Sequence, residues 1–303
     1  MGTLMSAARP ESVVPLSDGL VGVLGAMLAL IAIVVLGLRP LFGAALMVLC
    51  AGVPMAFLER SRRPVSHNPT KRDRILFSTL KILFLIRYPI ALVSALGTVI
   101  SVDHVLLQTV SLLISLELTL AINGYLFGFE RIVPTLRSMQ KHWLGWVSCL
   151  ICYSPFILLI PPAKAIMVNE ALWPVRAPPP ILAFVLLGAT LLSLSATICF
   201  GLRFANLANR GVITTGPFRL MKHPQYTFHV ISFWSAAFFF MPFSWVTMAA
   251  LIFLTAAYRL RAITEEWHMS ESPEYVEYAT WIEEHGLLAK VRSLGRFYRP
   301  LKG

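Results

Sequence analysis

Apolar stretches long enough to cross a membrane recur along most of this chain, and they constrain its fold more than any other feature. A spanning helix needs about 20 predominantly apolar residues. Eight candidate spans are found, at residues 20–37, 41–57, 75–102, 105–129, 144–160, 181–204, 226–240 and 243–258. Of the 303 residues, 57% are hydrophobic and 14% are charged, which is too few charges to cover a soluble surface. The sequence therefore predicts an all-α, polytopic integral membrane protein with about eight transmembrane helices.

Two of the expected turns between spans are marked by proline, which cannot continue a helix interior. Arg39-Pro40 separates the first two spans, and Met241-Pro242 separates the last two. Lys and Arg gather in alternate loops and in the tail, so the positive-inside rule places both termini in the cytoplasm. The net charge of +11 is thus explained by orientation and by contact with anionic lipid, and we expect no nucleic-acid partner. A bacterial inner membrane and the endoplasmic reticulum both suit this pattern.

The polar tail after the last span predicts a short cytoplasmic helix at residues 273–285. Ser272 suits the N-cap position, Pro273 the first helical position, and Glu274 the first turn. Gly286 suits the C-terminal stop. The four cysteines all lie in apolar runs, and the single C-x-x-C pair has no second pair or histidine pair to complete a metal site. We therefore expect no metal centre.

The stretch TTGPFRLMKHPQY, at residues 214–226, lies on the predicted cytoplasmic side and leads into a span. Pro224 disfavours a helical conformation at His223 and suits the first position of the helix. The free amides at that helix start, with Arg219, Lys222 and His223 alongside, form a candidate site for a carboxylate or phosphate. The alternative is a basic loop at a membrane edge with no ligand.

A second polar stretch, YRLRAITEE at residues 258–266, follows the last span. Adjacent carboxylates at Glu265 and Glu266 are costly at a membrane boundary unless they are solvated or paired. They can accept hydrogen bonds from ribose hydroxyls or an ammonium group. The alternative is a simple Arg261–Glu265 ion pair, four residues apart on a wet helix.

Together, these stretches resemble the integral-membrane methyltransferases, which include isoprenylcysteine carboxyl methyltransferases and phospholipid N-methyltransferases. The shared pattern is a G-P-[FY]-R-x-x-[RK]-H-P-x-Y loop, a helical hairpin, R-x-x-x-E-E, and a Y-x-x-Y tail, over roughly residues 202–278. The resemblance implies an S-adenosylmethionine site between the last helices and the tail. Consistently, the chain has no strand followed by the G-x-G-x-x-G motif of a soluble dinucleotide fold.

The resemblance also implies roles for particular residues. The residues expected to hold the cofactor are Gly216, Pro217, Arg219, His223, Pro224, Tyr226, Glu265 and Glu266. Arg261, Glu265 and Glu266 are the catalytic candidates, with Arg261 orienting the acceptor or steadying the glutamate pair. Tyr275 and Tyr278 share a helix face; they close the pocket from below or, equally well, pack that face on the membrane domain.

Two charged residues, Arg87 and Glu117, lie near the middle of consecutive predicted spans. Each is about 15 residues from the turn between them, so their depths match at 1.5 Å per residue. A lone charge at that depth costs several kcal/mol, so we expect the two side chains to pair. The pair is either a structural clamp or a polar wall for a lipid headgroup or an ion path, which makes both residues substrate-binding candidates.

The resulting hypothesis is a membrane methyltransferase that takes S-adenosylmethionine from the cytoplasm and an amphiphilic lipid or isoprenoid acceptor from the bilayer. A carboxylate acceptor, giving a methyl ester, is the first choice, and a phospholipid or lipid amine is the second. Residues 1–175 would support the fold or select substrate, and residues 176–303 would form the methyltransferase-like core. The alternatives are an NADPH-dependent membrane sterol-type reductase and a non-enzymatic lipid-binding protein or transporter.

Overall fold

The computed structural model describes residues 16–60, 69–101, 105–128, 135–153, 179–240 and 244–291, and these are almost entirely helical. The α-helices are α2 (Leu16–Leu36), α3 (Pro40–Arg60), α4 (Lys71–Ser101), α5 (Val105–Leu126), α6 (Trp143–Ile151), α8 (Pro180–Phe200), α9 (Pro224–Phe240), α10 (Trp245–Met269) and α11 (Pro273–His285). Two short 3-10 helices, η3 (Gly201–Arg203) and η4 (Gly216–Arg219), lie between α8 and α9. The strands β1 (Ser138–Met139) and β2 (Ala208–Asn209) form one small antiparallel ladder.

Six helices of the described part are long and apolar enough to cross a membrane: α2, α3, α4, α5, α8 and α10. Helix α9 is shorter, at 17 residues. The predicted class, an all-α polytopic membrane protein, is confirmed. The predicted span at 144–160 is wrong in its described part, because α6 has only nine residues and ends at Ile151. Its sequence continues into Ser154-Pro155, and proline disfavours a helical conformation before it; residues 154–160 lie outside the described part.

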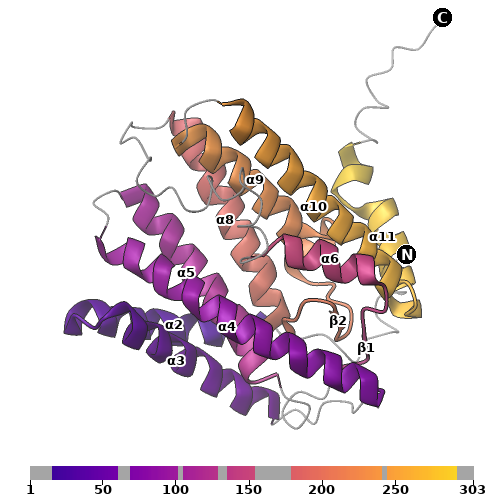
Figure 1. Ribbon diagram of the computed structural model, residues 1–303, viewed down its shortest axis with the longest axis horizontal. Helices are drawn as coiled ribbons and strands as arrows, with labels where there is room; N and C mark the ends of the chain where they lie inside the picture. Colours follow the sequence, from indigo (N-terminus) through magenta and orange to yellow (C-terminus); the bar gives the residue numbers. More distant parts are fainter. Residues whose placement is uncertain are drawn as a thin grey trace, which may run out of the picture.

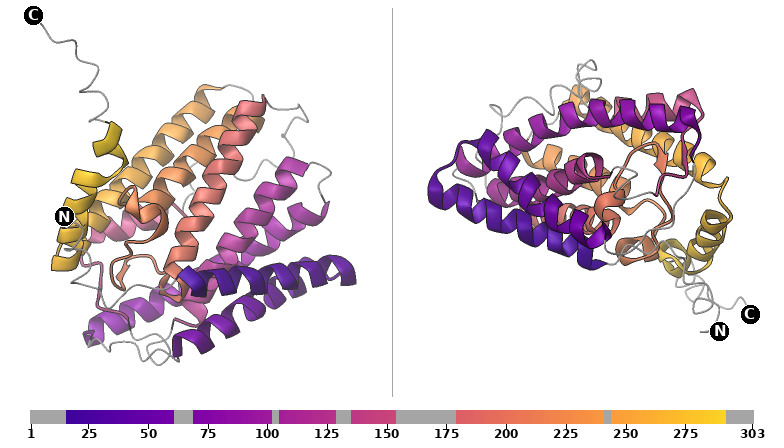
Figure 2. Two further views of the ribbon diagram at one scale, coloured as in Figure 1. Left: turned by 180° about the vertical axis from the view of Figure 1, so that it is seen from behind. Right: turned by 90° about the horizontal axis from the view of Figure 1, so that it is seen from below.

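Helices that follow one another in the sequence pack against each other in pairs. Helices α2 and α3 form one hairpin, α4 and α5 a second, and α8 packs along α9. Figure 1 shows α8, α9 and α10 running side by side, with α11 at their outer edge. Seen from behind, α2 and α3 run crosswise to that group (Figure 2). Helix α5 packs against α8 and so joins the N-terminal hairpins to the C-terminal helices.

Several helix boundaries fall where proline and glycine predict them. Helix α3 begins at Pro40, and α9 begins at Pro224 with His223 just outside it. Helix α11 covers the predicted residues 273–285, with Gly286 following its last residue. The Ser272 side chain makes no capping hydrogen bond there, so the proline and the first-turn acid define this start. The predicted break at Met241-Pro242 lies outside the described residues.

The main core is built from aliphatic and aromatic side chains of α2–α5 together with the end of α8. Phe84 and Tyr125, stacked at 5.1 Å between ring centroids, are among the largest fully buried side chains. The outer faces of the same helices carry exposed apolar residues such as Leu28, Val35 and Ile86. Apolar side chains on the outside and polar ones inside are expected of helices that face lipid.

The β1–β2 ladder connects the segment after α5 with the long loop between α8 and α9. Ser138 pairs with Asn209, and Met139 pairs with Ala208. Next to the ladder, the backbone amide of Gln140 donates to the carbonyl of Leu207 at 2.8 Å. Leu207 has a φ of 59°, an uncommon left-handed conformation for a residue with a side chain. This strained turn points the preceding residue, Asn206, into the site described next.

Candidate active site

A pocket opens where the α8–α9 loop, the start of α9, the end of α10 and α11 meet. Together with its open mouth, it encloses about 710 Å³ of empty space. Its wall combines aromatic rings with charged and amide side chains, among them Arg203, Asn206, Arg210, Lys222, His223, Gln225, Tyr226, Arg261, Glu265, Tyr275 and Tyr278. A second, smaller hollow of about 370 Å³ shares Asn206, Tyr226, Arg261 and Glu265 with it. The two hollows are therefore one continuous site.

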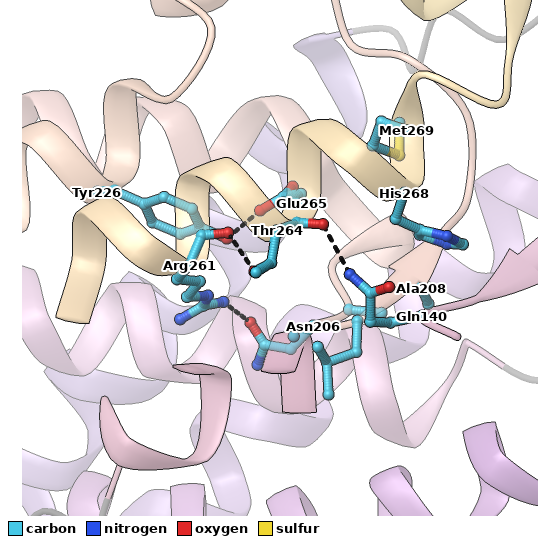
Figure 3. A pocket seen from close by; sticks show the side chains of 12 residues that line it. Gln140, Asn206, Ala208, Tyr226, Arg261, Thr264, Glu265, His268 and Met269 are labelled. Atoms are coloured by element: carbon cyan, nitrogen blue, oxygen red, sulfur yellow. Dashed lines mark hydrogen bonds between the residues drawn. The ribbon is translucent and has the colours of Figure 1, made fainter. Parts of the chain in front are cut away.

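The centre of the site is formed by Tyr226, Arg261 and Glu265 (Figure 3). The Tyr226 hydroxyl donates to Oε2 of Glu265. The Arg261 guanidinium lies 4.5 Å from the centroid of the Tyr226 ring, in cation–π contact. The structure thus brings together one residue of the H-P-x-Y motif and two of the R-x-x-x-E-E motif, which are separated by more than 30 residues in sequence.

Arg261 is held by residues that the sequence analysis missed. Its Nη1 donates to the hydroxyl of Tyr153 at 2.7 Å, and its Nη2 donates to Oδ1 of Asn206. The Asn206 amide in turn donates to the hydroxyls of Tyr125, at 2.8 Å, and Tyr88, at 3.2 Å. The alternative of an Arg261–Glu265 ion pair is not found. Instead, tyrosines of α4 and α5 orient Arg261 through Asn206.

Glu266 faces the α8–α9 loop rather than the centre of the pocket. Its Oε1 lies 3.0 Å from Nε2 of His223, and its Oε2 lies 3.1 Å from Nζ of Lys222. Lys222 also donates to Glu283 of α11 at 2.9 Å. Partial burial acts to lower the pKa of Lys222, but its hydrogen bonds with Glu283 and Glu266 outweigh burial and raise that pKa. This network joins the loop, α10 and α11 into one wall.

The two tail tyrosines, Tyr275 and Tyr278, line the pocket and are buried between it and α11. The Tyr278 hydroxyl donates to the carbonyl of Phe218 at 2.8 Å. The Tyr275 hydroxyl is buried and has no hydrogen-bond partner in the described part. Burial raises the pKa of both tyrosines, which therefore stay neutral donors. An unpartnered hydroxyl in a pocket wall suits a ligand that accepts a hydrogen bond.

Gly216, Pro217 and Arg219 of the G-P-x-R motif belong to the loop but are not among the residues that line the pocket. Gly216 has a φ of +58°, and a Cβ atom there would lie 2.6 Å from Sγ of Cys199. Pro217 and Pro224 are buried, and Arg219 is exposed. Of the residues predicted to hold the cofactor, those that line the pocket are His223, Tyr226 and Glu265.

Two further arginines of the pocket wall, Arg203 and Arg210, were interpreted from sequence only as positive-inside charges. The Nε of Arg210 donates to Oγ1 of Thr135 at 3.0 Å, and its Nη1 donates to the carbonyl of Leu202 at 2.8 Å. Burial, together with the nearby charge of Arg203, lowers the pKa of Arg210 to about 9. Two guanidinium groups therefore line this side of the wall, and Glu59, 4.0 Å from Nη2 of Arg203, offsets part of their charge.

The predicted pair of Arg87 and Glu117 is wrong. Glu117 turns toward α8 and α9, where its Oε1 accepts from Ser193 and Thr197, each at 3.0 Å. The Nε of Arg87 is buried and has no hydrogen-bond partner in the described part. Matching depths fix only the height of two residues along their helices. The direction around each helix axis decides the contact, and here it separates them.

The fold and the pocket define a polytopic helical membrane protein with a polar and aromatic pocket at one end of its C-terminal helices. Residues 181–273 match the sequence model of the phospholipid methyltransferase family, which is part of the integral-membrane methyltransferase group. No curated protein and no solved structure matches the chain. The family match confirms the resemblance, and it supports methyl transfer to a membrane lipid as the class of activity.

Proposed function

We propose that this protein transfers a methyl group from S-adenosylmethionine to a lipid or isoprenoid-linked acceptor that stays embedded in the membrane. The observation that carries the proposal is the Tyr226–Arg261–Glu265 centre, which lines a pocket inside the family-matched segment. A membrane location suits such an enzyme, because the acceptor's tail can stay in the bilayer while its head reaches the pocket. We place the pocket on the cytoplasmic side, where the positive-inside rule puts its loops.

The pocket wall fits the chemical groups of S-adenosylmethionine. The arginine side, with Arg203 and Arg210, suits the cofactor's carboxylate. Glu265 suits its ammonium or ribose hydroxyls, and the buried Tyr275 hydroxyl offers a free donor. Phe200 and Phe218, with ring centroids 5.2 Å apart, give the wall an apolar aromatic patch for the adenine.

When bound, S-adenosylmethionine supplies an activated methyl group on a sulfonium. The chain's own contribution is to hold donor and acceptor in line and to exclude water. Arg261, fixed by Tyr153 and Asn206, orients the acceptor or the Glu265 side chain. A carboxylate acceptor needs no base, whereas an amine acceptor must lose a proton, which Glu265 or Glu266 can take through water.

We further propose that residues 176–303 form the catalytic core and that residues 1–175 support it or select the acceptor. The Asn206 contacts with Tyr88 and Tyr125 favour this division of roles, because they connect α4 and α5 to Arg261. An O-methylated isoprenoid carboxylate and an N-methylated lipid amine both remain compatible with the Tyr226–Arg261–Glu265 centre itself.

Calorimetry on the purified protein in detergent tests the proposal, with S-adenosylhomocysteine and NADPH as ligands. We expect saturable binding of S-adenosylhomocysteine that is lost in Glu265→Gln and kept in Glu277→Gln, a matched change at an exposed position of α11. Binding of NADPH alone would assign the protein to the sterol-type reductases. Binding of neither ligand would favour a lipid-binding protein or transporter and overturn the proposal.

A further inference from the structure

A second polar cluster lies inside the helix bundle, away from the end of α10. Oε1 of Glu117 on α5 accepts hydrogen bonds at 3.0 Å each from Ser193 and Thr197 of α8 and from the Gln225 amide of α9. Nε2 of His229, also on α9, lies 3.1 Å from the same oxygen. We call these five residues the Glu117 cluster. Three helices from both halves of the chain thus converge on one carboxylate oxygen.

In the described part of the chain, no lysine or arginine pairs with this carboxylate. Among the described residues, the only ion-pair partner of Glu117 is His229, which carries a charge only when protonated. The hydroxyl and amide donors stabilise an anion but leave its charge in place. A carboxylate inside a membrane is costly unless a cation balances it. The cluster is therefore suited to a positively charged ligand.

The cluster keeps one acceptor atom available. All four contacts of Glu117 are made by Oε1, and Oε2 accepts no hydrogen bond from the described residues. The Glu117 side chain is 11% exposed and the His229 side chain 28% exposed. A ligand can therefore reach the carboxylate from outside the packed helices.

The cluster also adjoins the candidate active site. Gln225 lines the pocket, and its Nε2 donates both to Glu117 and, at 2.9 Å, to Thr197. At 1.5 Å per residue, Glu117 lies about 13 Å before the end of α5, and His229 about 8 Å after the start of α9. A lipid head that binds here would lie about 8–13 Å inside the helix ends, with its tail still in the bilayer.

We propose that the Glu117 cluster binds a cationic, amine-bearing headgroup of the lipid acceptor, with Oε2 of Glu117 accepting from its ammonium group. The inference rests on the proposed function and deepens it, because the Glu117 carboxylate attracts an ammonium group and repels a carboxylate, and so selects an amine acceptor. Glu117 lies outside the family-matched residues 181–273. The N-terminal helices therefore supply acceptor specificity to a pocket built by the C-terminal ones.

The test uses the full chain in phosphatidylcholine nanodiscs without cofactor, and it compares radiolabelled hexadecylamine with hexadecanoic acid. The two probes share a chain length and differ in the charge of the head. We expect the wild-type protein to bind the amine about tenfold more tightly than the acid, after subtraction of protein-free nanodiscs. Glu117→Gln should remove that preference, and the exposed control Glu277→Gln should keep it. Equal binding of both probes by the wild-type protein, or an unchanged preference in Glu117→Gln, would overturn the inference.

A second variant keeps the test decisive if Glu117→Gln does not fold. His229→Lys places a permanent cation beside Glu117, so it should abolish the amine preference while it satisfies the buried carboxylate. A retained preference in this variant would also overturn the inference. Calorimetry with S-adenosylhomocysteine on the same samples separates the two proposals. Amine preference without cofactor binding would refute the proposed function alone, and cofactor binding without amine preference would refute the inference alone.

Discussion

The protein has two carboxylate centres, and they differ in what surrounds them. At the end of α10, Glu266 contacts Lys222 and His223, and Glu265 lies in a wall that also contains Arg261. In the middle of α5, Glu117 has hydroxyl, amide and imidazole neighbours and no lysine or arginine partner in the described part. Lysine and arginine side chains thus accompany the first centre, whereas the second has only His229 as an ion-pair partner among the described residues. This difference in charged neighbours is the basis on which we propose different ligands for the two centres.

The largest effect is expected from Glu265→Gln. This change replaces the Glu265 carboxylate by an uncharged amide of the same size. We expect methyl transfer into membrane lipid to fall about 100-fold or more, since an oriented charged group in a pocket commonly contributes that much. Transfer of a tritiated methyl group from S-adenosylmethionine into extracted lipid measures it. Activity equal to that of the control Glu277→Gln would show that Glu265 is not part of the reaction site.

The second-largest effect is expected on stability, at the hydrogen bonds by which Asn206 joins α4 and α5 to Arg261. Asn206→Leu removes the acceptor for Nη2 of the buried Arg261 guanidinium and the donor to Tyr125. A hydrogen bond to a charged group contributes about 1.5–3 kcal/mol, so the free energy of unfolding should fall by that amount. Denaturant unfolding in detergent measures it. Asn206→Asp retains an oxygen for Arg261 and should lose less; equal losses in the two variants would argue against Arg261 as the partner that matters.

A smaller effect is expected in the G-P-x-R loop. Gly216→Ala places a side chain at a φ of +58° with its Cβ 2.6 Å from Sγ of Cys199. The left-handed conformation alone costs about 1–2 kcal/mol, so the melting temperature should fall by several degrees. Gly188→Ala in α8 is the matched control, because no atom lies within 4 Å of its added Cβ and alanine favours a helix. A melting temperature for Gly216→Ala at or above the control would contradict the loop geometry.

The smallest effect is expected at the surface of the tail. Nζ of Lys141 donates to Glu271 at 2.7 Å and lowers the pKa of that carboxylate. The stabilisation is therefore present above the ordinary carboxylate pKa of 4.5 and is lost as the pH falls through the lowered value. Because both side chains are about half exposed, Lys141→Ala should reduce stability at pH 7 by only a few tenths of a kcal/mol.

Melting curves of the wild-type protein and Lys141→Ala at pH 7 and pH 3 check this expectation. The small difference at pH 7 should shrink as the pH falls toward 3, because Glu271 becomes protonated and the ion pair is lost. A difference of the same size at both pH values would mean that Lys141 acts through packing and not through its charge.

The helices and their ends could be predicted from sequence, because they depend on local features. Apolar length predicts spans, and Pro40, Pro224 and Pro273 begin helices where proline is expected to. The span at 144–160 failed for a local reason as well, since the helix within it ends at Ile151 before a proline. The apolar composition of this segment predicts a span, but Pro155 is a local signal against a continuous helix.

The candidate site could be predicted only in part, because its contacts depend on how helices are rotated about their axes. The resemblance to the integral-membrane methyltransferases pointed to Tyr226, Arg261 and Glu265, and all three line the pocket. Asn206 gave no motif signal, and it enters the site through a left-handed turn at Leu207 that no sequence pattern marked. Glu117 stood out as a charge within a span, but its true neighbours on α8 and α9 required the packing of three helices.

Photolabelling with 8-azido-S-adenosylmethionine, followed by peptide mapping, tests the central claim most directly, because it reports where the cofactor lies. The account predicts labelled peptides from the pocket wall, within residues 200–226 and 261–278, and protection by excess S-adenosylhomocysteine. It predicts no protected label on α5 around Glu117, where the acceptor's head would bind. Protected labelling confined to α4 and α5 would contradict the account, because it would place the cofactor at the second centre and not the first.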